Sequence, residues 1–470
     1  MEYTFSEEKF ISSFNAKSTE EKSADSMRLT HKPDGAFKLF PFKASGKTQA
    51  PIVTNLEDIV SGFFREALGK KTEPIDFETL CDAILEEVDV DDDDLDFFKD
   101  MIQSLFFVGN DFVANNLGLY PYQTVSNSKS AENLAHFMFS VLGVTEADCK
   151  RVEEAKDNYK FNVIENMVIQ TMESKKVSDA ERKEPYFCIK TDVQKKFRDD
   201  FYYMLESGMT SLEDFSNLFS LYYFYYVSQT CITLDRFCDG DRESAVDFYF
   251  ALDWEKVSKN RLCCVSGWDK LQASISHMFS HAITLEILNQ TESEEKWDYI
   301  AFDDYVTRYP EKDELVAEQI RKAEKIYCSY VGDYKNFDEI GYSVSKSRTE
   351  ETIMHLFKCV EAQFLETDRR RANQFYNEKY SEFCKNRWVK NRKKSGLVLN
   401  LTERDVIFLT KLSLKNEEKI RLNDLYKEYE YRGIHLDNAS KEFLQEFFTK
   451  LNLIDKKSDS GDAQYVKRIL

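Results

Sequence analysis

The feature that most constrains the fold of this chain is a stretch of 20 residues without a formal charge, from Phe215 to Leu234. A helix of about 20 apolar residues is long enough to cross a bilayer. Seven residues of the stretch are Ser, Thr, Asn or Gln, however, and four tyrosines occupy its centre. Tyrosine prefers the interface of a membrane to its midplane. The pattern therefore predicts a buried core helix, and we expect no membrane partner.

Helical spacing of apolar residues continues through most of the chain. From Leu56 onward, apolar side chains recur at intervals of three and four residues, the period of an amphipathic helix. Only 15 of the 470 residues are glycine and seven are proline. A hydrophobic content of 42% is too high for a disordered chain. We expect a mainly α protein, with a multi-helical body and a long helix leading to a C-terminal winged-helix-like domain.

Four regions are expected: an extended N-terminal arm with short strands (1–50), a helical body (51–345), a long basic helix or connector (346–396) and a winged-helix-like domain (397–470). In the arm, apolar residues alternate from Phe37 to Phe42, and nearby prolines exclude a long helix. From Arg348 to Lys394, apolar residues repeat at helical spacing without a glycine or a proline. One continuous helix is therefore expected over this connector.

The order of elements after residue 396 predicts the winged helix. Thr402 is suited to cap a first helix. A short strand near Ile420 and two further helices follow, and the segment Ser458 to Asp462 has the composition of a hairpin turn. Helix, strand, helix, helix and hairpin is the order of a winged helix, an elaborated helix-turn-helix.

Charge is distributed unevenly along the chain. The net charge of −20 argues against a protein that coats nucleic acid without sequence preference. From Arg369 to Lys394, however, ten basic residues stand against two acidic ones, so this segment carries +8 and the remainder −28. Aromatic residues interleave with these charges: Tyr376, Tyr380, Phe383 and Trp388. Such a stripe predicts contact with a phosphate backbone. The alternative is that its cations pair with acidic faces of the protein or of a partner, while its aromatics pack in the core.

The candidate DNA-binding or partner-binding residues lie in this stripe and in the expected hairpin: Arg369, Arg370, Arg371, Lys385, Arg387, Lys390, Arg392, Lys393, Lys394, Lys456, Lys457, Lys467 and Arg468. The expected third helix of the small domain, 438–451, has two lysines against two glutamates. A helix that reads a DNA groove usually presents more Arg, Lys, Asn or Gln, so this helix favours contact with a protein.

Two motifs for nucleotide or metal binding are incomplete. Ser45-Gly46-Lys47-Thr48 ends like a phosphate-binding loop, but Pro41 stands where that loop requires its first glycine. The run from Asp89 to Asp96 begins like a calcium loop, but its sixth position is not glycine and its twelfth is not glutamate. We interpret this run as a solvated acidic turn.

His277 and His281 are four residues apart and would share one face of a helix, which is a spacing of metal ligands. We interpret them instead as hydrogen-bonded core or surface histidines. The ten cysteines form no C-x-x-C pair, and the N-terminus lacks the pattern of a secretory signal. These features indicate free thiols and a cytoplasmic protein. We expect no catalytic residue, metal or cofactor.

The C-terminal residues carry a family resemblance. The segment from Leu451 to Leu470, LNLIDKKSDSGDAQYVKRIL, and the preceding Arg432 to Asp437, RGIHLD, resemble the C-terminus of the DptG (DndG) family. These proteins are subunits of the bacterial DNA phosphorothioation-dependent restriction system, an antiphage defence. The resemblance covers about 40 residues. It implies DptF and DptH partners, which carry the nucleotide-dependent motor parts, and it transfers no catalytic residue.

The leading hypothesis from the sequence is a non-catalytic adaptor subunit of this restriction complex, associated with double-stranded DNA and with partner motor subunits. Two alternatives belong to other classes. One is a metal-dependent nuclease subunit of the same system, for which Asp89 to Asp94 would be the first place to look. The other is a winged-helix transcription regulator, which the near-neutral third helix and the acidic body disfavour.

Overall fold

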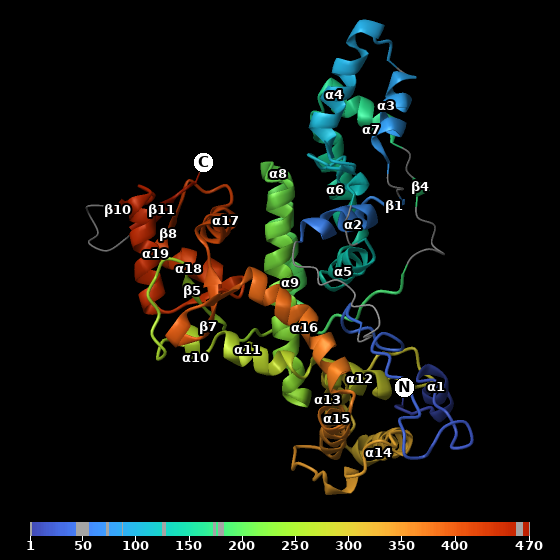
Figure 1. Ribbon diagram of the computed structural model, residues 1–470. Helices are drawn as coiled ribbons and strands as arrows, with labels where there is room; N and C mark the ends of the chain where they lie inside the picture. The colour runs from blue at the N-terminus through green and yellow to red at the C-terminus, as the bar shows by residue number, and fades with distance from the viewer. Residues whose placement is uncertain are drawn as a thin grey trace.

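The structure is a computed structural model that describes residues 2–43, 56–71, 75–86, 88–124, 128–172, 175–176, 183–456 and 464–469 (Figure 1). The protein is mainly helical and has small sheets. Helices α2 to α7 form a lobe at the upper right of Figure 1, and the C-terminal elements lie at the left. Helices α12 to α15 and the N-terminal arm lie at the bottom, and α9 and α16 cross the middle.

The helices of the first half are α1 (Glu7–Ser13), α2 (Glu57–Ala67), α3 (Phe77–Leu85), α4 (Leu95–Phe106), α5 (Ser128–Val141), α6 (Glu146–Asn158), α7 (Val163–Thr171), α8 (Asp192–Ser207) and α9 (Leu212–Asp235). The second half contains α10 (Leu262–Val265), α11 (Trp268–Ile275), α12 (Met278–Leu288), α13 (Tyr299–Arg308), α14 (Asp313–Tyr330), α15 (Arg348–Glu366), α16 (Arg370–Arg387), α17 (Glu403–Leu414), α18 (Leu422–Tyr431) and α19 (Asn438–Lys450).

The strands are short: β1 (Lys70–Lys71), β2 (Phe107–Val108), β3 (Asp111–Phe112), β4 (Lys175–Lys176), β5 (Tyr249–Leu252), β6 (Val389–Asn391), β7 (Leu397–Leu401), β8 (Lys419–Arg421), β9 (His435–Leu436), β10 (Ile454–Lys456) and β11 (Gln464–Lys467). They form two antiparallel pairs, β1 with β4 and β2 with β3, a three-stranded sheet in the order β10-β11-β8 and a four-stranded sheet in the order β6-β7-β5-β9.

Helix α9 contains the uncharged stretch and confirms the predicted core helix. Ser211 and Asp214 form a capping box at its start, and every residue from Leu218 to Leu234 is buried. Helices α2, α5, α8, α11 and α17 pack against it. Gln229, a buried polar residue of the stretch, exchanges two hydrogen bonds of 2.8 Å with the backbone of Val246. No helix in the described part of the chain is long and apolar enough to cross a membrane.

A buried ion pair joins α8 to the C-terminal elements next to α9. Arg432 and Asp200 are 1% and 0% exposed, and the guanidinium donates two hydrogen bonds, of 2.7 and 2.6 Å, to the carboxylate. The Tyr222 hydroxyl of α9 donates to the same carboxylate at 2.8 Å. Two parallel hydrogen bonds fix the geometry of such a pair as well as its charge. The pair therefore sets how α18 is oriented against the helical core.

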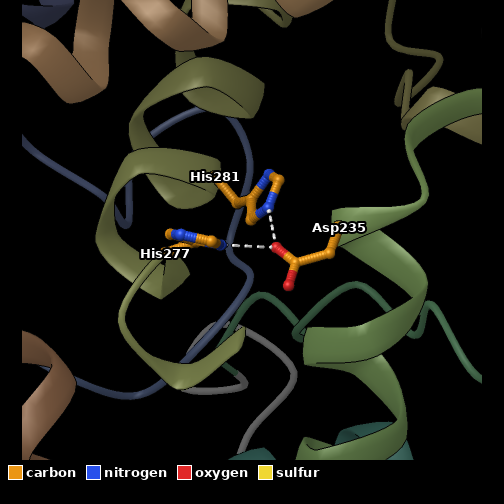
Figure 2. Close-up of side chains that lie close together, drawn as sticks. All are labelled: Asp235, His277 and His281. Carbon is orange, nitrogen blue, oxygen red and sulfur yellow. Dashed lines mark hydrogen bonds and ion pairs between the residues drawn. The ribbon is translucent and has the colours of Figure 1, made fainter. Parts of the chain in front are cut away.

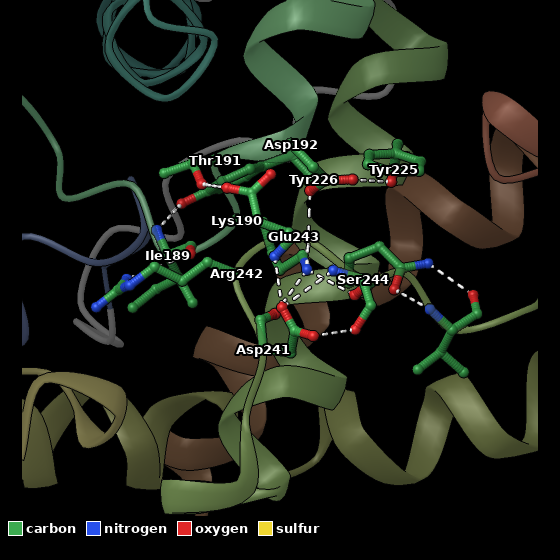
Figure 3. Close-up of polar contacts among 12 residues, drawn as sticks. Ile189, Lys190, Thr191, Asp192, Tyr225, Tyr226, Asp241, Arg242, Glu243 and Ser244 are labelled. Carbon is green, nitrogen blue, oxygen red and sulfur yellow. Dashed lines mark hydrogen bonds and ion pairs between the residues drawn. The ribbon is translucent and has the colours of Figure 1, made fainter. Parts of the chain in front are cut away.

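A second buried cation anchors the segment before α8 (Figure 3). The Lys190 side chain is fully buried, and its ammonium donates to the carbonyl oxygens of Asp241 and Ser244 at 2.7 Å each. Burial lowers the pKa of this ammonium, while neighbouring carboxylates, that of Asp192 first, oppose the shift. The Tyr226 hydroxyl of α9 accepts a hydrogen bond from the Ile189 amide at 3.1 Å. These contacts hold 189–191 between α9 and the loop that precedes β5.

The prediction of one long helix over the connector is wrong, because the chain forms two helices, α15 and α16. Thr367 has extended backbone angles, φ −123° and ψ 177°, and it ends α15. Its hydroxyl donates to the Gln363 carbonyl at 2.7 Å and accepts from the Arg369 amide at 3.2 Å. A threonine side chain can replace helical backbone hydrogen bonds in this way. The spacing of apolar residues does not show where a side chain replaces backbone hydrogen bonds, so the helical pattern in the sequence continues across the break.

The two ends of the chain pack onto the helical core. Within the described part of the N-terminal arm, 2–43, the segment Phe37 to Phe42 forms no β-ladder, although Phe37, Leu39 and Phe40 are fully buried. The expected arm contains one short helix and two isolated β-bridges, Phe5 with Thr291 and Met27 with Val331. Apolar alternation here reflects burial of an irregular segment on the core.

Strands of the C-terminal region pair with a strand from the body. Strand β5 lies between β7 and β9 and runs parallel to both. Strand β6 pairs with β7 across the expected boundary near residue 396. The predicted elements of 397–470 are present: Thr402 caps α17 in a capping box, and Ile454 pairs with Val466 in a hairpin. The predicted turn at 458–462 lies outside the described residues, as does the 45–48 segment.

Substitution of Arg432 by alanine is expected to lower the free energy of unfolding by about 3–5 kcal/mol, because it leaves the buried Asp200 carboxylate without its guanidinium partner. Chemical denaturation of the full chain measures this loss. Lys427→Ala is the matched control, because Lys427 pairs with Asp424 on the surface and is 73% exposed. We expect that control to change stability by less than about 1 kcal/mol. Equal effects of the two substitutions would contradict the role of the buried pair.

Candidate functional site

The aromatic residues of the basic stripe lie in the core rather than on a binding surface. Tyr376, Tyr380 and Phe383 are 0% exposed, and Trp388 is 2% exposed. The Tyr380 hydroxyl contacts Ser228 of α9 at 2.7 Å. These rings cannot stack on nucleotide bases without unfolding α16 from α9. The alternative interpretation from the sequence, that these aromatic residues pack in the core, is therefore confirmed.

Four cations of the stripe make contacts within the protein. Arg387 pairs with Asp405 and lies over the Trp388 ring at 4.3 Å, and Lys390 pairs with Asp253. Arg392 donates to backbone carbonyls of the β5 region, at 2.6 Å for Leu252 and 3.2 Å for Asp253 and Glu255. Lys385 pairs with Glu382 at 2.8 Å. The first three of these cations fix β6 and β7 against β5 or α17.

Three consecutive arginines are exposed at the break between α15 and α16. Thr367 turns the chain out of α15, and the exposed Asp368 separates it from Arg369, Arg370 and Arg371. Among the described residues, no ion pair involves these three side chains. We call Arg369 to Arg371 the arginine cluster. A compact cationic group of this kind on an acidic protein can attract a phosphate backbone locally.

Further exposed cations lie at the other end of α16 and near the C-terminus. Lys393 and Lys394 are exposed in the turn between β6 and β7, and Lys467 and Arg468 are exposed at the end of β11. Lys456 belongs to β10 by its backbone, but its side chain and all of Lys457 lie outside the described residues. The structure therefore separates the predicted site residues into several surface groups and a set of internal contacts.

Arg468 borders a hollow of about 320 Å³ between α8, α17 and the C-terminal segment, whose lining includes Lys411 and Lys415. Lys415 donates to the Asp199 carbonyl at 3.4 Å. The hollow brings together cations that are far apart in the sequence. The stripe in the sequence ended at Lys394 and did not reveal Lys411 or Lys415 as neighbours of the hairpin.

Helix α19, the expected third helix of the small domain, is attached to the body at its start. Asp437 caps it by accepting from the Ser440 amide at 3.0 Å, and Arg261 donates to the Asp437 carboxylate at 3.0 Å and to the Ser440 hydroxyl at 2.7 Å. Trp254 stacks on Phe447, with ring centroids 4.6 Å apart. These contacts occupy one face of the helix and make it part of the main core.

A separate cluster joins the two predicted histidines to a carboxylate at the end of α9 (Figure 2). One oxygen of Asp235, Oδ1, lies 2.9 Å from Nδ1 of His277 and 3.0 Å from Nε2 of His281. His277 precedes α12 and His281 lies in its first turn, so the two share one face as their spacing predicted, and both rings point to the end of α9. The other nitrogen of His281 lies 3.0 Å from the Tyr299 hydroxyl, and Glu361 lies 3.6 Å from His277 Nε2.

The Asp235 cluster shifts the pKa values of its members in different directions. Its hydrogen bond to Asp235 raises the pKa of His277. Burial lowers the pKa of His281, although the same carboxylate opposes that shift. Burial would raise the pKa of Asp235, but hydrogen bonds from both imidazoles hold it well below its usual range. The carboxylate therefore favours the protonated form of His277, and burial favours the neutral form of His281.

These hydrogen bonds agree with the interpretation of the histidines as satisfied residues, and the same donor atoms could also hold a divalent cation. Sequence spacing found the two histidines but not Asp235 or Glu361, which come from α9 and α15. The acidic run named for a metal site is elsewhere, as an exposed 3-10 turn at Asp92–Asp94. Comparison with known protein families and with curated proteins gives no match.

Substitution of Asp235 by asparagine is expected to lower the pKa of His277 toward its ordinary value near 6.5, because it removes the carboxylate that stabilises the imidazolium. A folded-state pKa above the unfolded one means that this contribution to stability is full below about pH 6.5 and is lost as pH rises through the folded value. Histidine-ring NMR measures the titration. Glu361→Gln is the control and should shift it less. An unchanged His277 titration in Asp235→Asn would contradict the assignment.

Proposed function

We propose that this chain is a non-catalytic adaptor subunit of a phosphorothioation-dependent DNA restriction complex, which links double-stranded DNA to partner subunits of the DptF and DptH kind. The resemblance of Arg432 to Asp437 and Leu451 to Leu470 to the DptG family supports the choice of complex. The exposed arginine cluster is the observation that carries the DNA contact. A cytoplasmic location is part of the proposal and agrees with ten free cysteines.

The sheet order of the C-terminal region supports a winged-helix-like unit. Strand β11 lies between β8 and β10, and both of its pairings are antiparallel. With α17, α18 and α19 this gives helix, strand, two helices and a hairpin, the arrangement expected of a winged helix. Because α19 is near neutral and one face of it is packed on the body, we assign the unit to partner contact rather than to reading of DNA sequence.

The DNA contact is assigned to cations that the protein leaves exposed. The arginine cluster begins α16, and Lys393 and Lys394 follow its other end. A helix of 18 residues is about 27 Å long, close to the rise of eight base pairs of duplex DNA. The remainder of the chain is strongly acidic and repels phosphate, so it restricts binding to these groups.

Replacing Arg369, Arg370 and Arg371 together by glutamine is expected to weaken binding of a 30-base-pair duplex and to reduce the slope of log affinity against log salt by about 2 to 3, because each lost phosphate contact contributes about 0.9. Fluorescence anisotropy at several salt concentrations measures both quantities. The matched control is Arg151→Gln, Arg321→Gln and Lys335→Gln, which removes two exposed cations and one half-buried cation that pair with exposed carboxylates elsewhere.

The control has the same change in net charge, so it separates a local contact from a general effect of charge. An equal loss of affinity in both variants would contradict a local site. Unchanged DNA affinity of the arginine variant, together with unchanged co-purification of DptF- and DptH-type partners, would contradict the proposal as a whole.

A metal-dependent nuclease subunit is the second candidate, and the cluster of Asp235, His277 and His281 is the observation that favours it. His277 is 37% exposed and Asp235 is 25% exposed, so a cation and a phosphate can approach. If this candidate is right, purified protein nicks plasmid DNA with Mg²⁺ or Mn²⁺, and Asp235→Asn abolishes the nicking. Equal nicking by that variant, or none by the natural chain, would rule the cluster out as a nuclease centre.

A further inference from the structure

A second group of metal-binding side chains lies between α14 and α15, apart from the surfaces discussed above. The two helices run side by side in the same direction. Their starts lie together, since Asp313 at the start of α14 accepts hydrogen bonds of 2.8 Å from the amides of Arg348 and Thr349 at the start of α15. Glu324 and Cys328 are four residues apart on α14, and His355 and Cys359 are four residues apart on α15. Residues at this spacing share one helix face.

The parallel alignment places these two pairs opposite each other. Glu324 Oε2 lies 2.7 Å from His355 Nδ1, and Cys359 Sγ lies 3.8 Å from the same nitrogen. The ligand atoms of Glu324, His355 and Cys359 all lie within 4.8 Å of one another. Cys328 lies outside this group of three, but it is one helical turn after Glu324 on α14, and the neighbouring Cys359 thiol raises its pKa. Two of these four side chains come from α14 and two come from α15.

The imidazole is oriented as that of a metal ligand. His355 Nε2 lies 2.8 Å from the Ile340 carbonyl oxygen, and a carbonyl can only accept, so Nε2 carries a proton. Nδ1 faces Glu324 and Cys359, and its hydrogen bond to the Glu324 carboxylate contains one shared proton that a metal ion would displace. The Tyr342 ring stacks on the imidazole, with centroids 3.8 Å apart and an interplanar angle of 4°, and fixes its plane. Zinc-binding histidines characteristically donate their second nitrogen to a carbonyl or carboxylate in this way.

We propose that Glu324, Cys328, His355 and Cys359 bind a structural Zn²⁺ ion. Two thiolates, one imidazole and one carboxylate are a tetrahedral donor set that favours zinc over magnesium or calcium. Tetrahedral zinc separates nitrogen and sulfur ligands by about 3.6 Å and nitrogen and oxygen ligands by about 3.4 Å. The separations of 3.8 and 2.7 Å among the first three ligands require only small side-chain movements to reach these values, and the Cys328 side chain must turn toward them to complete the set.

Four protein ligands leave no position for substrate, so the ion is structural. It ties α14 to α15 and, through the Ile340 carbonyl, to the loop 331–347 that returns between them. Glu324, His355 and Cys359 are buried and Cys328 is half-buried, which leaves an entry path from the Cys328 side. Binding converts both thiols to thiolates and displaces the proton shared by His355 and Glu324, so three protons are released to the solvent. This site does not depend on the adaptor function proposed above.

The test begins with the metal content of the full chain purified from zinc-containing medium. We expect elemental analysis by inductively coupled plasma mass spectrometry to find about one zinc ion per chain. Cys359→Ser and His355→Gln should lose it. Cys264→Ser is the matched control for a half-buried cysteine outside the group, and His277→Gln separates this site from the Asp235 cluster. Both controls should keep the zinc. Loss of zinc in His277→Gln but not in Cys359→Ser would overturn the proposal.

A second measurement uses the unaltered chain and does not depend on the variants folding. Replacing zinc by Co²⁺ should give the visible bands of a tetrahedral site and an intense thiolate-to-cobalt absorption in the near ultraviolet. Added zinc should also protect Cys328 and Cys359, but not Cys264, from alkylation. Less than about one tenth of a zinc ion per chain after reconstitution, or a cobalt spectrum without the thiolate band, would overturn the proposal.

Discussion

The burial of α9 on all sides is the constraint on which the rest of the structure depends. A helix without a charged face has no side to give to water, so segments from every part of the chain must cover it. Helices α2 and α5 come from the first third, α8 and α11 from the middle, and α17 from the C-terminal region. The fold is therefore built around α9, and elements far apart in the sequence meet on its surface.

Covering α9 also determines where polar groups must be placed. Its tyrosine hydroxyls need partners once they leave water. Tyr222 uses the Asp200 carboxylate, which in turn requires Arg432, and Tyr226 uses the backbone next to Lys190. The same logic applies to the basic stripe. Arg387, Lys390 and Arg392 make ion pairs and carbonyl contacts that hold the β6–β7 hairpin, whereas Arg369 to Arg371 and Lys393 to Lys394 of the stripe are exposed to an external partner.

Periodicity predicted the mainly helical class of the fold. It found α9, the helix pattern of the body and the elements after Thr402, because apolar spacing follows burial. It missed the break at Thr367, where one hydroxyl replaces backbone hydrogen bonds. Site geometry was harder to predict. His277 and His281 are visible as a pair, but Asp235 is 42 residues away from His277, and Glu324 lies 31 residues from His355. Such contacts depend on how the helices pack together, and the spacing of residues along the sequence does not give this packing.

The central functional claim is that DNA contacts the exposed cations at the ends of α16 rather than the acidic surface. The most direct test is photo-crosslinking of the full chain to a duplex that carries photoreactive groups along both strands, with the crosslinked peptides identified by mass spectrometry. The account predicts crosslinks in the peptides that contain Arg369 to Arg371 and Lys393 to Lys394. Crosslinks confined to the α2–α7 lobe, under conditions in which the duplex is bound, would contradict it.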